Sequence, residues 1–203
     1  MDWEEFRFPD ADWFAEGSHR HRFEAADNAT DDELFARMEQ MRFGTWPTPN
    51  RYLADLEDKL LARDPGHAGL LRALAEQDLY AGLNARAIER LEKALERRPR
   101  DGEILCLLGW AQLRLGRYDE AVVRFSEASA ALPLRANALT GLVCARLAAG
   151  HAEEALAASD RLAESFGADP WGRLVRVMAL RRAGQTARAV EGLKALLTQD
   201  PLW

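Results

Sequence analysis

Residues 102–135 read GEILCLLGWAQLRLGRYDEAVVRFSEASAALPLR, and this stretch decides the fold. On both sides of Gly116, apolar residues recur every three or four positions, which is the spacing of one face of a helix. They are Leu105, Leu108 and Ala111 before the glycine, and Ala121, Phe125 and Ala128 after it. Glycine ends a helix well because a left-handed backbone conformation costs it little. The stretch therefore predicts two helices joined by a short turn.

The same pattern recurs along the chain every 34 residues. The repeated positions are Gly82, Gly116, Gly150 and Gly184, then Ala87, Ala121, Ala155 and Ala189, and finally Pro65, Pro99, Pro133 and Pro201, with Gly167 in the slot that breaks the proline series. The alanine lets two helices cross closely, and the proline closes the second helix because it cannot continue one. One helix pair cannot bury its apolar face alone, whereas about three or more stacked pairs can.

This unit resembles the tetratricopeptide repeat, whose pattern is Trp-x2-Leu-Gly-x2-Tyr, then Ala-x3-Phe, then Pro. The best match lies in the second unit, with Leu105, Leu108-Gly109, Gly116, Tyr118, Ala121, Phe125, Ala128 and Pro133. The resemblance implies an all-α solenoid of about four helix-turn-helix repeats behind an irregular acidic and aromatic N-terminal segment. The four units are 68–101, 102–135, 136–169 and 170–203.

Two units depart from the pattern. In the third, Ser159 stands where a large apolar residue is usual. In the fourth, Arg173 and Arg176 fall on positions that are usually apolar. We therefore expect the first helix of the fourth unit to be rotated or shifted by one residue.

Two further segments precede the repeats. Thr30-Asp31-Asp32-Glu33 is a capping box, in which the Thr30 hydroxyl and the Glu33 carboxylate satisfy free N–H groups at a helix start. It predicts a helix over 31–43, and a second helix is expected over 50–63 after a break rich in proline. We interpret 31–67 as a degenerate repeat or N-terminal cap, and 1–30 as an acidic, aromatic arm.

Charge and composition exclude several classes of protein. Residues 1–50 carry a net charge of −7, residues 51–203 carry +1, and the total of −6 argues against a nucleic-acid partner. No stretch without charge exceeds ten residues, whereas a membrane span needs about 20. The N-terminus does not resemble a signal peptide. We expect a cytoplasmic protein that has no membrane partner and keeps Cys106 and Cys144 as free thiols.

Residues with the spacing of a catalytic or metal site are scarce. His19 and His21 lack the further ligands that a metal needs, and neither a phosphate-binding loop nor a nucleophile elbow occurs. We therefore expect no enzyme activity, no metal and no cofactor. The alternatives are an accessory subunit of an enzyme or secretion complex, or a metal-dependent enzyme that uses His19 and His21; stoichiometric zinc or iron would favour the latter.

In tetratricopeptide units the first helix lines a concave groove, as the resemblance implies. The side chains at groove positions are Arg72, Glu76, Tyr80, Trp110, Arg114, Asn137, Trp171, Met178 and Arg181, with Glu103, Cys106 and Leu113 at further positions of the same kind. Exposed apolar side chains indicate a partner, and Trp, Tyr and Arg often anchor interfaces. Alternatively, Trp110 and Trp171 pack between helices, as we expect for Leu79, Leu113 and Leu147.

We therefore predict a non-catalytic adaptor or chaperone-like module that binds a peptide or protein segment. The acidic C-termini of heat-shock chaperones are disfavoured as ligands, because Glu76 would repel a carboxylate. A narrower interpretation is that the chain is similar to the class II chaperones of type III secretion, which are small repeat proteins without a signal sequence.

The arm itself has the composition of a ligand for the groove. Residues 1–16 contain six acids and five aromatic side chains, Trp3, Phe6, Phe8, Trp13 and Phe14. We expect the arm to dock on the repeats of its own chain or of a second copy and to compete with a partner. The alternative is a mobile or locally packed arm. A homo-oligomer could also form through the C-terminal repeat, where Val190, Leu197 and Trp203 are expected to be exposed.

Overall fold

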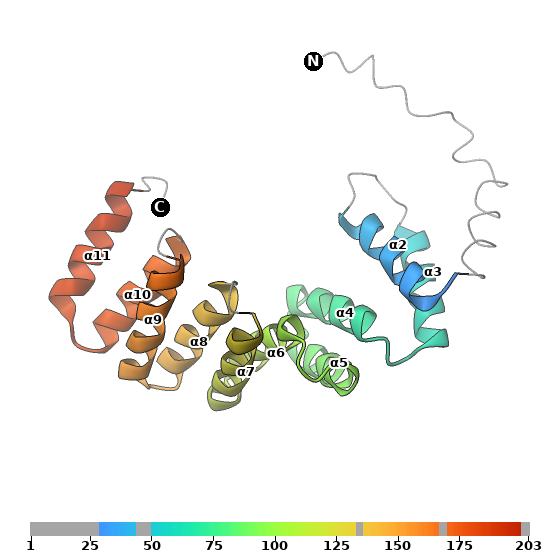
Figure 1. The fold of residues 1–203 in the computed structure, drawn as a ribbon, viewed down its shortest axis with the longest axis horizontal. Helices are drawn as coiled ribbons and strands as arrows, with labels where there is room; N and C mark the ends of the chain where they lie inside the picture. The colour runs from blue at the N-terminus through green and yellow to red at the C-terminus, as the bar shows by residue number, and fades with distance from the viewer. Residues whose placement is uncertain (1–28, 44–49, 133–135, 167–169, 200–203) are drawn as a thin grey trace, which may run out of the picture. The chain divides into compact units, whose positions relative to one another are not determined.

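The computed structural model describes residues 29–43, 50–132, 136–166 and 170–199, and every element in them is an α-helix (Figure 1). The chain divides into two compact units, residues 1–65 and 66–203. The first unit contains α2 (Asp31–Phe43) and α3 (Asn50–Arg63). The second contains four helix pairs: α4 (Ala68–Tyr80) with α5 (Asn84–Arg97), α6 (Gly102–Arg114) with α7 (Tyr118–Ala131), α8 (Ala136–Ala148) with α9 (Ala152–Phe166), and α10 (Pro170–Arg182) with α11 (Thr186–Gln199).

The first unit confirms the capping box and the two helices predicted with it. The Thr30 N–H donates to Glu33 Oε2 at 2.8 Å, and the Glu33 N–H donates to Thr30 Oγ1 at 3.3 Å. At the end of α3, Arg63 donates to the Ala29 carbonyl at 2.8 Å and pairs with Asp31 at 3.3 Å. The interpretation of this unit as a repeat cap stays a prediction. The aromatic residues of the arm, His19, His21 and Trp203 lie outside the described residues.

The turns of the second unit confirm the role expected of the repeated glycines. Gly82, Gly116, Gly150 and Gly184 have φ angles of 77°, 76°, 86° and 75°. This left-handed region is unfavourable for residues with a Cβ, and glycine enters it at little cost. The repeated alanines, Ala87, Ala121, Ala155 and Ala189, are all buried, as expected at close helix crossings.

The stacking of the pairs separates the two kinds of helix. Each first helix after α4 contacts the second helix of its own pair and that of the preceding pair, and it also contacts the neighbouring first helix (Figure 1). A curved stack brings the elements on its inner side closest together. Helices α4, α6, α8 and α10 therefore line the concave side of the second unit.

The Phe125 side chain fills the space where the second and third pairs meet. It is fully buried, and its ring packs edge-on against Trp110 with the centroids 5.1 Å apart. A Cβ at Gly109 of α6 would lie 3.0 Å from this ring, and one at Gly141 of α8 would lie only 2.2 Å away. Both helices therefore approach the ring through a residue without a side chain.

Ser159 is the residue of the third pair that corresponds to Phe125. It is fully buried, and its hydroxyl donates to the Leu156 carbonyl at 2.7 Å. Because the hydroxyl is satisfied within α9, burial of this serine leaves no polar group without a hydrogen bond. The departure from the repeat pattern is thus accommodated inside the core.

Two alternatives were expected for the first helix of the fourth unit, a rotation or a one-residue shift, and the helix bounds contradict the shift. Helix α10 begins at Pro170, which is 34 residues after the start of α8 at Ala136. Arg173 and Arg176 keep the positions that the 34-residue interval gives them, and both are only half-buried. Arg176 also pairs with Asp160 of α9, with Nη2 and Oδ1 2.7 Å apart.

Candidate functional site

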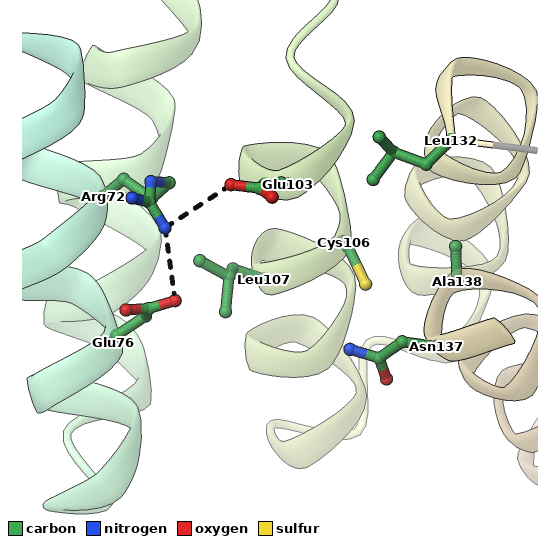
Figure 2. A pocket seen from close by; sticks show the side chains of 8 residues that line it. All are labelled: Arg72, Glu76, Glu103, Cys106, Leu107, Leu132, Asn137 and Ala138. Carbon is green, nitrogen blue, oxygen red and sulfur yellow. Dashed lines mark hydrogen bonds and ion pairs between the residues drawn. The ribbon is translucent and has the colours of Figure 1, made fainter. Parts of the chain in front are cut away.

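A pocket of about 190 Å³ crosses the first three helices of the concave side (Figure 2). Its lining brings together five residues at predicted groove positions: Arg72 and Glu76 of α4, Glu103 and Cys106 of α6, and Asn137 of α8. The remaining lining residues are Leu107 of α6, Leu132 at the end of α7, and Ala138 of α8. Three repeats thus contribute side chains to one depression.

Ion pairs organise the charges of this pocket. Arg72 Nη1 lies 3.4 Å from Glu76 Oε1 on its own helix and 3.6 Å from Glu103 Oε2 on α6 (Figure 2). All three side chains remain in contact with solvent, so these pairs add little stability. With two carboxylates and one guanidinium, this end of the concave side has a formal charge of −1. It suits a basic or hydrogen-bond-donating side chain.

The predicted anchors at other positions of the first helices are exposed. The exposed fraction is 93% for Tyr80 at the end of α4, 58% for Trp171 and 45% for Met178 on α10. Arg181 is also exposed. Side chains of this size are available to a partner, because the repeats themselves leave them uncovered.

Trp110 and Arg114 stabilise the stack of repeats. Trp110 is half-buried against Phe125, and Arg114 Nη1 donates to the Leu79 carbonyl at 2.6 Å. This hydrogen bond joins the end of α6 to the end of α4, where the Leu79 carbonyl also accepts a hydrogen bond from the Gly82 N–H at 3.2 Å. Of the leucines expected in the core, Leu79 and Leu147 are buried and Leu113 is half-buried.

Three residues of the pocket, Leu107, Leu132 and Ala138, are not among the predicted groove residues. Leu107 follows a groove position directly, and Leu132 lies just after α7, so neither falls on the expected groove pattern. For Leu107 a signal was present in the sequence. The corresponding residue of the next unit is Gly141, and a leucine in place of a glycine alters the surface that neighbouring helices share.

Both cysteines are free thiols, as predicted, and both lie on first helices. Cys106 is buried at the pocket, and Cys144 is half-buried. Burial raises the pKa of the Cys144 thiol. Because a thiolate is the reactive form, this cysteine is a poor nucleophile at neutral pH and acts in packing.

Among the described residues, the structure contains neither a cluster of metal-ligand side chains nor a helix that could cross a membrane. No group of three or more His, Cys, Asp or Glu side chains lies close enough to hold a metal ion in this part of the chain. Over the same ranges, every helix is too short or too polar to cross a membrane.

Residues 78–143 match the family model of the tetratricopeptide repeat, which confirms over this stretch the resemblance predicted from the sequence. No curated protein matches the sequence. Among solved structures, a crystal structure of MamA is 21% identical, with 73% of this chain and 87% of that chain covered and a TM-score of 0.67. MamA from Desulfovibrio magneticus RS-1, from residue 41 to its end, is 16% identical, with 84% and 95% covered and a TM-score of 0.70. These likenesses show a shared fold.

Proposed function

We propose that this chain is a non-catalytic interaction module that holds a peptide or protein segment on its concave side. The observation that carries the proposal is the exposure of Tyr80, Trp171 and Met178 on the helices that line this side. Leaving large apolar surface in water is unfavourable, and covering it with a partner removes that cost. Aromatic residues of this kind commonly anchor interfaces.

The polar residues would give such a partner its orientation. Arg72, Glu76 and Asn137 offer hydrogen bonds at one end of the concave side, and Arg181 offers a guanidinium on α10. Because these polar groups lie at separate places along the concave side, they favour a segment whose charged residues and apolar anchors follow a matching order. We further propose that the module acts in the cytoplasm as an adaptor or chaperone-like protein, and that its arm regulates access to the concave side.

Selection of peptides from a random display library on the full chain tests this function. The enriched peptides should bind Tyr80→Ser and Trp171→Ser variants at least about tenfold more weakly, because anchors of this size contribute more than 1.4 kcal/mol. Val123→Ser is the matched control, since Val123 is 52% exposed on α7, which is not a concave helix. Failure to enrich any peptide, or an equal loss in the control, would show that the concave side is not a binding surface.

We also propose that the chain self-associates through α11. Leu193 is exposed, whereas the corresponding Leu91, Phe125 and Ser159 of the earlier pairs are all fully buried. Val190 and Leu197, which are also exposed, lie on the same face of α11 at helical spacing. Val190, Leu193 and Leu197 together form an apolar stripe, which is the kind of helix surface that packs against another helix.

Light scattering over a range of concentrations tests this association. The mass should rise toward that of a dimer, and Leu193→Glu combined with Leu197→Glu should keep the chain monomeric. The expected cause is the penalty for burying two carboxylates in an apolar contact. An unchanged monomer mass for the unmodified chain at high concentration would contradict the proposal.

A further inference from the structure

The fourth helix pair differs in charge from the other three. Residues 170–199 contain six basic side chains and one acidic side chain, a formal charge of +5. The corresponding charges are 0 for 68–97, −1 for 102–131 and −2 for 136–166. The positive charge of the second unit is therefore concentrated on α10 and α11.

Part of this charge lies beside the exposed apolar residues of α10. Trp171, Met178 and Arg182 are seven and four residues apart, which places them on one face of the helix. Arg181 lies next to this face, and both arginines are exposed. We call Trp171, Met178, Arg181 and Arg182 the α10 face. It combines two large apolar side chains with two guanidinium groups.

We propose that residues 1–16 of this chain dock on the α10 face. This segment has the complementary composition, with six acids, one arginine and five aromatic side chains. Its carboxylates can form charge-assisted hydrogen bonds with the guanidinium groups, and its aromatic rings can cover Trp171 and Met178. The inference rests on the proposed function, because the docking site is part of the same concave side.

The charges elsewhere on the concave side favour this location over the other repeats. The pocket between α4 and α6 contains Glu76 and Glu103 around Arg72, so an acidic segment would be repelled there. The two middle pairs are slightly negative. Electrostatic attraction therefore directs residues 1–16 to the fourth pair.

This docking defines the chemistry of a competing partner. A tethered segment has an effective concentration on the order of millimolar, so it occupies its site even when its intrinsic affinity is modest. A partner that displaces it must present the same kind of surface to Trp171 and Arg181. The partner class is therefore an acidic segment that carries aromatic side chains.

A photo-crosslinking amino acid placed at Met178 of the full chain tests the docking. Irradiation should join position 178 to residues 1–16, and mass spectrometry identifies the crosslinked peptides. A product of monomer mass shows docking within one chain, and a product of twice that mass shows docking from a second copy. The matched control carries the same crosslinker at Val123, which has similar exposure on α7, and should capture no residue of 1–16.

Charge reversal tests the electrostatic part of the proposal. Arg181→Glu with Arg182→Glu should reduce the yield of the crosslink at least about fivefold, because carboxylates then face carboxylates. Lys93→Glu with Arg161→Glu makes the same change at two exposed cations on other helices and should leave the yield unchanged. Thermal melting of each variant confirms that it is folded.

The outcomes separate this inference from the proposed function. Crosslinks from position 178 that map outside residues 1–16, or a yield that is insensitive to Arg181→Glu with Arg182→Glu, would overturn the docking. If peptides selected on the chain still require Tyr80 and Trp171 in that case, the interaction function stands without the arm. If no peptide binds either, both proposals are wrong.

Discussion

Replacing Gly141 with alanine should lower the free energy of unfolding by about 2 kcal/mol, although alanine is the better helix former. The added Cβ would lie 2.2 Å from Cε1, 2.5 Å from Cζ and 2.6 Å from Cδ1 of Phe125. That ring is fully buried and packed against Trp110, so it cannot move aside without disturbing its neighbours. The cost of overpacking, about 3 kcal/mol, exceeds the gain in helix propensity, about 1 kcal/mol.

Two further variants identify Phe125 as the cause. Gly109→Ala brings a Cβ to 3.0 Å from the same ring and should cost less. Phe125→Leu combined with Gly141→Ala should recover most of the loss, because leucine occupies the corresponding position of the first pair at Leu91. Urea unfolding followed by circular dichroism measures each difference. A Gly141→Ala variant as stable as the unmodified chain would contradict the packing described for Phe125.

Replacing Asp78 with alanine should cost about 2–3 kcal/mol of stability. The carboxylate is buried on α4 and accepts hydrogen bonds from Arg86 and Arg90 of α5, with 2.8 Å between Arg86 Nε and Asp78 Oδ1. The hydrogen bond to Asp78 also raises the pKa of the Arg86 guanidinium. The expected cost is below that of breaking a fully buried pair, because both arginine side chains retain solvent contact, at 55% and 28% exposure.

A double-mutant cycle on Asp78 and Arg90 distinguishes their ion pair from an ion pair at the protein surface. Asp78→Ala and Arg90→Ala, alone and together, should give a coupling energy above about 1 kcal/mol in urea unfolding. Arg124 and Glu127 form an exposed ion pair at 2.9 Å, and their cycle should give less than about 0.5 kcal/mol. Equal couplings in the two cycles would show that burial of Asp78 has no energetic consequence.

The positions that correspond to Asp78 and Arg86 also contact each other in the later repeats, but through different side chains. Gln112 Nε2 donates to Glu120 Oε2 at 3.2 Å in the second pair, and Arg146 lies 3.6 Å from Glu154 Oε2 in the third. The sign of the charges is therefore reversed between the first and third pairs. A search for repeated residue types overlooks this contact, because only its location in the repeat is preserved.

The elements predicted well are those that depend on neighbouring residues in the chain. The capping box, the four turn glycines and the bounds of α2 and α3 follow from backbone preferences that act over a few residues. The predicted shift of α10 was wrong because Arg176 is matched by Asp160, sixteen residues earlier on another helix. Leu107 was missed for a related reason, since its exposure depends on the helices beside α6.

The sequence by itself determined the series of helix pairs, because a glycine turn, a small crossing residue and two apolar faces recur at one fixed interval and each acts locally. Only the tertiary structure decided how the pairs fit together. Where α7 presents Phe125, α8 presents Gly141, so the volume at this junction is balanced between residues of different helices. The ion pair of Arg72 with Glu103 likewise joins side chains of different helices at the concave side. The balance of volume and charge depends on which side chains meet in space, and the spacing of residues along the chain does not specify it.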